Sequence, residues 1–273
     1  MAVRKSSPKL GLKKTNDIPL TSEYLLVVLS DLSSRIQQFF GSMAPVNLVV
    51  HGGAVMVLHS GLQTRAQTLD IDYLHRGFEA EWKQRGLHDA GARLRKCIAE
   101  TAARFDLGAD WMNAHADVAL PFTVDSKSQE PYDYVWHATM SEQNVIDNTI
   151  YSSPTLNLIA VPWCWGVALK LVRYQKHDPF DIACILVRGK KIKAVEKWDV
   201  RTVERWLAKE CGVMGYSAYS PQQVQVNRDR VKHAILFASS IEIHGKTRSM
   251  ELYKNQQLVQ AMTNAPFHTM PVR

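Results

Sequence analysis

The sequence contains few cysteines and no closely spaced pair of them. Its 273 residues include four, at positions 97, 164, 184 and 211. This wide spacing excludes a zinc ribbon and a disulfide framework, and it favours a reducing compartment. The ten histidines form no ligand pattern such as HExxH, so we expect oxygen atoms to hold any bound metal.

Long apolar runs are missing as well. The longest candidates, residues 25–29 and 156–161, are far shorter than the roughly 20 residues that cross a bilayer. A membrane-spanning protein is therefore excluded. No apolar segment follows the first charged residues, so a secretory signal is not expected. We expect a cytoplasmic protein, with a nuclear or mitochondrial location left open by the basic residues Arg4, Lys5, Lys9, Lys13 and Lys14.

The composition allows one sizeable core, or a core with a smaller lobe, because 46% of the residues are hydrophobic and 22% are charged. The formal net charge of +7 attracts polyanions but does not identify one. A DNA-reading protein is not expected, since the basic residues between positions 85 and 96 are mixed with Asp89 and show no helix-turn-helix spacing.

The first half of the chain combines helical and extended patterns. Thr21 and Ser22 precede apolar residues spaced three and four apart up to Gly41, which predicts a capped helix. A β-branched run at 46–50 then leads into Gly52 and Gly53, an apolar helical stretch and a second strand-like run at 69–74. We expect a further helix over 79–105 and strands over 132–136, 145–151 and 156–161.

From Pro162 onward the pattern is helical, with segments at 163–174, 180–187, 200–210 and 221–243. The sequence therefore predicts an α+β protein in three parts. These are a disordered basic tail (1–20), a mixed α/β domain (21–161) and a helical C-terminal lobe (162–273).

The run LDIDYL carries the first candidate site. In a strand, side chains alternate between faces, so Asp70 and Asp72 would share one face, opposite Leu69, Ile71 and Tyr73. Two adjacent carboxylates repel each other unless a cation compensates them, which suggests Mg²⁺ or Mn²⁺. Taken alone, the pattern also fits a solvated edge strand.

The second signal is Gly52-Gly53, between the predicted strand and the predicted helix. Without side chains at these positions, backbone N–H groups at the helix start can approach a phosphate closely. A tight turn that needs glycine only for its dihedral angles is the alternative. The acid pair about twenty residues later favours the phosphate interpretation.

The stretch HGGAVMVLHSGLQTRAQTLDIDYL resembles the signature of the nucleotidyltransferase superfamily. It is similar to the minimal nucleotidyltransferases that include the abortive-infection type IV toxins and their uncharacterised relatives. A second matching stretch, LNLIAVPWCWGVALKLVRYQKHDPFDIACIL, contains Lys170, Arg173, Lys176, Asp178 and Asp181. Together the two cover roughly residues 46–186.

The resemblance implies a nucleotidyltransferase-like mixed sheet flanked by helices, and it implies roles for single residues. Gly52 and Gly53 would hold the triphosphate of a nucleoside triphosphate, and Asp70 and Asp72 would hold Mg²⁺ or Mn²⁺. Further nucleotide contacts would come from four residues: Arg65, Lys170, Asp178 and Asp181. Arg65 could instead support the carboxylates, and Lys170 would also act in catalysis together with Asp70 and Asp72. The sequence DPFD is also an ordinary helix start, so capping by Asp178 and Asp181 stays open.

The active pattern usually includes a third carboxylate from a later strand. The chain offers Asp110, Asp117 and Asp125, none in a convincing strand, and Asp117 is the best of these candidates for a catalytic acid. The segment ADWMN resembles a Trp-x-Asn motif of the uncharacterised relatives, and this resemblance implies that Trp111 packs and that Asn113 caps or orients the site.

Two functions follow. The first is transfer of a nucleoside monophosphate from a nucleoside triphosphate to a hydroxyl of RNA, a protein or a small molecule. The alternative is a catalytically inactive binding module of the same fold. The oligomeric state does not follow from the sequence.

Overall fold

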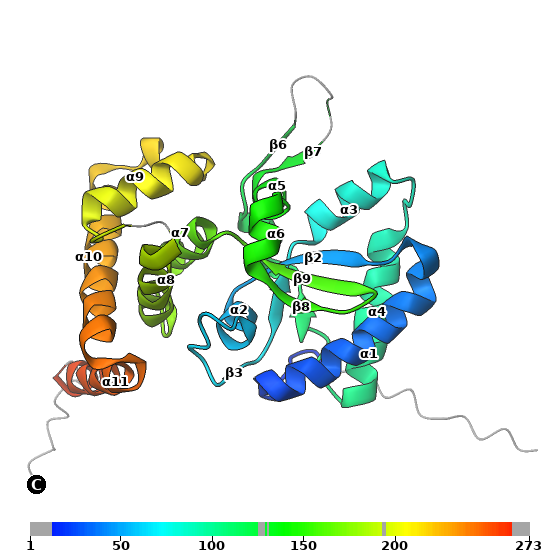
Figure 1. Ribbon diagram of the computed structural model, residues 1–273, viewed down its shortest axis with the longest axis horizontal. Helices are drawn as coiled ribbons and strands as arrows, with labels where there is room; N and C mark the ends of the chain where they lie inside the picture. Colours follow the sequence, from blue (N-terminus) through cyan, green and yellow to red (C-terminus); the bar gives the residue numbers. More distant parts are fainter. Residues whose placement is uncertain (1–12, 125–128, 130, 193–194, 264–273) are drawn as a thin grey trace, which may run out of the picture. The chain divides into compact units, whose positions relative to one another are not determined.

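Figure 1 shows the computed structural model, which describes residues 13–124, 129, 131–192 and 195–263. The chain divides into two compact units, Met1–Gly166 and Val167–Arg273. The first combines helices and strands, and the described part of the second is helical. The expected α+β class is therefore confirmed. The division falls within α7 (Trp163–Arg173), a few residues beyond the boundary expected at 161.

A five-stranded mixed sheet organises the first unit, in the order β5-β4-β2-β9-β8. Strand β2 pairs parallel with β9 and antiparallel with β4, β4 pairs parallel with β5, and β8 pairs antiparallel with β9. The strands are β2 (Val46–His51), β4 (Ile71–Tyr73), β5 (Met112–Asn113), β8 (Thr149–Ser152) and β9 (Leu156–Ala160). Two small ribbons pair β1 (Leu20–Thr21) with β3 (Gln67–Thr68) and β6 (Phe122–Val124) with β7 (Pro131–Asp133).

Helices surround this sheet, and α1 and α4 run side by side along one side of the unit (Figure 1). The helices of the first unit are α1 (Ser22–Phe40), α2 (Gly53–Leu58), α3 (His75–Gln84), α4 (Ala90–Phe105), α5 (Tyr134–Thr139) and α6 (Glu142–Asn148). Short 3-10 helices cover Gly41–Met43 and His115–Ala119.

Helix α1 confirms the capped helix that the sequence predicts. The Thr21 hydroxyl accepts a hydrogen bond from the Tyr24 N–H at 3.3 Å. At the other end Gly41 has a φ of 55°, a conformation that favours glycine. Five of the six apolar residues of the predicted stripe are buried, and Phe39 is half-buried. The five are Leu25, Leu29, Leu32, Ile36 and Phe40. Burial of this stripe holds α1 on the unit.

The single helix expected over 79–105 is wrong, because two helices, α3 and α4, cover this region. The break follows Arg85, where Gly86 adopts a φ of 85° and its N–H turns back to the Lys83 carbonyl at 3.0 Å. A left-handed glycine of this kind ends a helix.

Two expected strands are helical over much of their length. Over 132–136 the strand ends at Asp133, whose Oδ1 accepts from the N–H groups of Val135 and Trp136 and so starts α5. Over 145–151, α6 continues to Asn148 before β8 begins. The buried Asn144 donates to the carbonyls of Thr139 and Ala160, which ties α6 to its surroundings. The strand expected over 156–161 is confirmed as β9.

The described part of the expected tail is ordered. The Lys13 carbonyl accepts from the Ala109 N–H at 2.7 Å, Asn16 is buried, and Leu20 is paired in β1. The expectation of disorder up to residue 20 is therefore wrong for this stretch, and residues 1–12 lie outside the described part.

The second unit is built on α8 (Asp178–Ile192) packed against α10 (Pro221–His244), with α9 (Val200–Glu210) and α11 (Lys246–Thr263) beside α10. Phe180 and Phe237 meet edge to face at 5.4 Å between ring centroids. A capping box of Ser220 and Gln223 starts α10. The four expected helical segments are confirmed, whereas α11 was not expected. Of the helices that the structure describes, none combines the length and the apolar character needed to cross a membrane.

Candidate functional site

The acid pair lies at the start of β4 in the first unit. Asp72 stands opposite His51 in the antiparallel ladder with β2, and Asp70 comes directly before the strand. Ile71 and Tyr73 are buried as expected, but Leu69 is 50% exposed, because the strand begins only at Ile71. The predicted alternation therefore holds for the strand but not for Leu69.

The two carboxylates interact electrostatically. Burial and then the charge of Asp72 raise the pKa of Asp70, and the charge of Asp110 makes a smaller contribution in the same direction. The Thr68 hydroxyl, 3.4 Å from Asp70 Oδ1, opposes the shift. A cation beside the pair would remove the repulsion between the two charges.

Gly52 lies directly against Asp72. It has a φ of 76° and a ψ of −144°, and a Cβ atom built on it would collide with Asp72 Oδ2. This position therefore requires glycine for its backbone conformation and also for the space that the carboxylate occupies. The turn and the acid pair, about twenty residues apart in sequence, form one cluster.

Gly53 is closed in by two polar side chains from the segment before β4. A Cβ atom on Gly53 would collide with the Thr68 hydroxyl and would lie 3.2 Å from an Arg65 Nη1 atom. Arg65 thus places a positive charge beside the glycine turn, where an anion could use both the guanidinium and the backbone N–H groups.

Helix α2, which starts at Gly53, has only six residues. The sequence predicts that the start of this helix attracts a phosphate, but so short a helix has little dipole of its own. Attraction for an anion at the turn would therefore come from the Arg65 guanidinium and the local N–H groups.

The neighbouring strand β5 brings an amide, not an acid, beside the pair. Asn113 stands opposite Asp72 in the parallel ladder of β4 and β5. Its Oδ1 accepts from the His115 N–H at 3.0 Å, and its Nδ2 donates to the Asp110 carbonyl at 3.0 Å. Trp111 is fully buried. The burial of Trp111 agrees with the packing role expected for it. The two bonds of Asn113 hold its own segment, and its side chain also hydrogen-bonds Asp70, which lowers the pKa of that carboxyl; an orienting role stays a prediction.

Asp117, the candidate for a third catalytic acid, has a different set of contacts. Its Oδ2 accepts from the N–H groups of His75 and Arg76 at 2.9 and 2.8 Å, so it caps the start of α3. Burial raises the pKa of Asp117. Asp125 lies outside the described residues. Within residues 13–124, 129, 131–192 and 195–263, no group of three or more His, Cys, Asp or Glu side chains is arranged to hold a metal.

Asn16 is a contributor that sequence reasoning missed. Its side chain donates to the Leu69 carbonyl at 2.7 Å and accepts from the Gly108 N–H at 3.1 Å, and its own N–H donates to Asp110 Oδ1 at 2.5 Å. It thereby links the residue before Asp70 to the segment before β5. No local sequence pattern indicates contacts between residues so far apart in the sequence. The only hint is that Asn16 lies at the end of a polar tail.

The remaining predicted site residues lie in the helical unit and contact one another. Lys170 is buried and donates to Asp181 Oδ2 at 2.8 Å, with Asp178 Oδ1 at 3.7 Å. Arg173 donates two bonds of 2.9 Å to Asp178. Burial alone would raise the pKa of Asp178, but the bonds from Arg173 and from the Gln175 N–H lower it.

The sequence DPFD allows either a capping role or a nucleotide-binding role for Asp178 and Asp181, and their contacts bear on this choice. Asp178 accepts from Arg173 and from the Gln175 N–H, which both precede α8, so its carboxylate closes the turn between α7 and α8. Asp181 lies within the first turn of α8 and is paired with Lys170. The two acids thus hold the start of α8 through side-chain bonds to the preceding segment.

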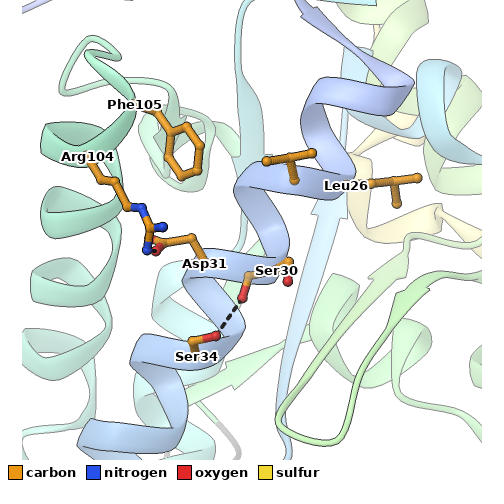
Figure 2. Close-up of a pocket in the computed structure, with 7 residues that line it drawn as sticks. Leu26, Ser30, Asp31, Ser34, Arg104 and Phe105 are labelled. Carbon is orange, nitrogen blue, oxygen red and sulfur yellow. Dashed lines mark hydrogen bonds and ion pairs between the residues drawn. The ribbon is translucent and has the colours of Figure 1, made fainter.

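A groove on the first unit is lined by none of the candidate site residues (Figure 2). Arg104 faces Asp31 there, with Nη1 2.6 Å from Oδ1. Burial opposes ionisation of Asp31, but bonds from Arg35 and Thr101 lower its pKa. The two charged residues of the groove lining, Asp31 and Arg104, are therefore paired with each other. The lining residues are Leu26, Val27, Ser30, Asp31, Ser34, Arg104 and Phe105.

Comparison with known proteins finds no matching family model, no matching curated protein and no matching solved structure.

Proposed function

We propose that the first unit is a nucleotidyltransferase-like domain that binds a nucleoside triphosphate with Mg²⁺ or Mn²⁺ at the cluster of Gly52, Gly53, Arg65, Asp70 and Asp72. The observation that carries the proposal is the contact between Gly52 and Asp72, which joins a side-chain-free turn to an acid pair. A divalent cation fits the pair, because its donors are carboxylate oxygens whose mutual repulsion helps to raise the pKa of Asp70.

Each side chain of the cluster would have a role that follows from its chemistry. Asp70 and Asp72 would hold the cation, which when bound neutralises phosphate charge. Arg65 would contact a phosphate oxygen beside the turn. In the proposed transfer, the oxygen of an acceptor hydroxyl forms a bond to the α-phosphorus, the bond from the α-phosphorus to the bridging oxygen of the β-phosphate breaks, pyrophosphate leaves, and the hydroxyl proton passes to solvent water. The acceptor is a hydroxyl of RNA, a protein or a small molecule.

Lys170, Asp178 and Asp181 enter the proposal through the resemblance alone. Their contacts with one another are satisfied within the helical unit. A nucleotide-binding role for Lys170 would therefore require it to leave Asp181 or to share its charge.

One observation favours the alternative, a binding module without turnover. Asn113 stands in register with Asp72, on the strand next to the acid pair. An amide there can orient a ligand but cannot take up the proton of an attacking hydroxyl as a carboxylate can.

The test combines binding with turnover. Labelled nucleoside triphosphates, Mg²⁺ or Mn²⁺ and total RNA are incubated with the full chain, and label is followed on RNA and on the protein. Calorimetry measures nucleotide and metal binding to the wild type and to Asp70→Asn/Asp72→Asn. Asp147→Asn, a change at an exposed acid of the same unit, is the control.

The outcomes separate the two functions. Label transfer that is lost in the double variant supports the enzyme. Nucleotide binding without transfer supports the binding module. Equal metal and nucleotide affinity in the wild type and the double variant would refute the site.

A further inference from the structure

The positive charge of the chain is concentrated in the helical unit. Residues 167–273 contain 18 of the 33 Lys and Arg residues and 9 of the 26 Asp and Glu residues. The first unit, with 15 basic and 17 acidic residues, is close to neutral. Such asymmetry between two parts of a chain is typical of a protein with one polyanion-binding part.

Part of this charge forms a stripe on α9. Arg201, Arg205 and Lys209 recur at intervals of four residues and are all exposed, so they lie on one face of the helix, about 6 Å apart along its axis. We refer to these three residues as the α9 basic stripe. Arg201 and Arg205 also line a shallow surface groove together with Glu204 and Ala208.

The acids near the stripe compensate little of its charge. Asp199 caps the start of α9 by accepting from the Thr202 N–H, and this bond and, to a smaller extent, the charge of Arg205 lower the pKa of Asp199. Glu204 pairs with Arg228 of α10, with Nε 2.7 Å from Oε1. Lys209 lies 3.6 Å from Glu210, but its side chain is 81% exposed, so water weakens this pair. In the described part of the chain, no carboxylate forms an ion pair with Arg201 or Arg205. Both guanidinium groups can therefore bind an external anion.

The helix face does not suit a lipid surface. The apolar residues Val203 and Leu207 are 1% exposed and point into the unit, where Trp206 stacks on Trp198. An interfacial membrane helix needs an exposed apolar face beside its basic one. The exposed positions of α9 are instead Arg201, Arg205, Ala208, Lys209 and Glu210.

We propose that the α9 basic stripe binds the phosphate backbone of a nucleic acid. Regularly spaced cations on a polar helix face match a line of phosphates and carry no means of reading bases. Binding should therefore be independent of sequence, and it should not distinguish RNA from DNA. This inference goes beyond the proposed transfer, since it requires neither a nucleoside triphosphate nor a metal.

The experiment measures binding of the full chain to a fluorescently labelled single-stranded RNA of about 20 nucleotides, and to DNA of the same sequence, over a range of salt concentrations. The test variant is Arg201→Gln/Arg205→Gln/Lys209→Gln. The control, Lys232→Gln/Arg248→Gln/Lys254→Gln, removes the same charge from exposed positions of α10 and α11.

Each phosphate contact to a single strand contributes about 0.7 to the slope of log affinity against log salt, so the test variant should lose about 2 from this slope. The control should lose clearly less. Arg201→Lys/Arg205→Lys should retain the wild-type slope, because point charges suffice for phosphate. Asp70→Asn/Asp72→Asn should bind the strands as the wild type does, which separates this surface from the proposed transfer site.

Three results would overturn the proposal. The first is an equal loss of slope in the test and control variants while both keep the wild-type circular dichroism spectrum. The second is a wild type that binds neither strand. The third is binding confined to vesicles of phosphatidylserine and phosphatidylcholine.

Discussion

Gly52 and Asp72 are in such close contact that a β-carbon at position 52 would collide with Oδ2 of the Asp72 carboxylate. The same glycine has a φ of 76°. The backbone conformation at position 52 and the contact with Asp72, a candidate metal ligand, therefore both require glycine.

Gly52→Ala should be more destabilising than Gly41→Ala. Both glycines have a positive φ and a ψ between −127° and −144°, but a Cβ on Gly41 meets nothing within 4 Å. The shared backbone strain costs about 1–2 kcal/mol, and only Gly52→Ala adds the collision with Asp72. Urea denaturation measures the difference, and calorimetry should show weaker metal binding for Gly52→Ala alone. Equal destabilisation by the two changes would contradict the close contact.

Gly53→Val should weaken nucleotide binding, because the added side chain would displace Thr68 and Arg65. Loss of one charge-assisted bond from Arg65 corresponds to about 1.5–3 kcal/mol of binding free energy. Calorimetry with a nucleoside triphosphate checks this. Normal binding by a variant with an unchanged circular dichroism spectrum would mean that the turn is only structural.

The effect of Mg²⁺ on stability should increase with pH. The raised pKa of Asp70 means that the folded protein binds the proton more tightly than the unfolded chain does. Ionisation of Asp70 therefore lowers the free energy of unfolding as pH rises from 3.8, the ordinary pKa of an aspartate, through the higher pKa of the folded state. A cation that binds the ionised pair offsets this loss. Melting temperatures with and without Mg²⁺, at a pH of about 4.5 and of about 7.5, test it, and Asp70→Asn/Asp72→Asn should show no such increase.

Lys170→Ala should be strongly destabilising, by about 3–5 kcal/mol, because it leaves Asp181 buried without its cation. In Lys170→Met/Asp181→Asn much of this loss should be recovered, since the second change removes the uncompensated charge. Denaturation of Lys170→Met, Asp181→Asn and their double variant gives the coupling energy. Additive effects would show that the pair is not coupled.

Asn16→Ala should destabilise the first unit by about 1–3 kcal/mol, because it removes the bonds to Leu69 and Gly108. It should also weaken metal binding at Asp70. The neighbouring Asp17→Ala, at a side chain that is 70% exposed, should do neither. Urea denaturation and metal calorimetry of the two variants make the comparison.

Sequence patterns predicted the elements that local chemistry determines. Helix α1 has a cap, a periodic stripe and a terminal glycine, and all three are visible in one short window. The sequence also predicts that Gly52 lies near the acid pair, because the strand before Gly52, the turn, a short helix and the strand with the acid pair follow one another closely in the chain.

Features that depend on contacts between distant segments could not be predicted. The β-branched residues Val145 and Ile146 suggested a strand, but buried bonds of Asn144 to Thr139 and Ala160 hold this stretch in α6. Strand β5 has only two residues, too few to show a period, so the register that sets Asn113 beside Asp72 was not visible. The capping of α3 by Asp117 likewise joins residues 42 positions apart.

The hydrogen bonds of Asn16 also bear on the order in which the protein is assembled. Its partners Leu69 and Gly108 follow it by 53 and 92 residues. During synthesis the N-terminal segment leaves the ribosome first, yet it can take its final place only after the chain beyond Asp110 has emerged. Contacts of such long range are slow to form. The candidate site should therefore be completed only after the segment that precedes β5 has left the ribosome.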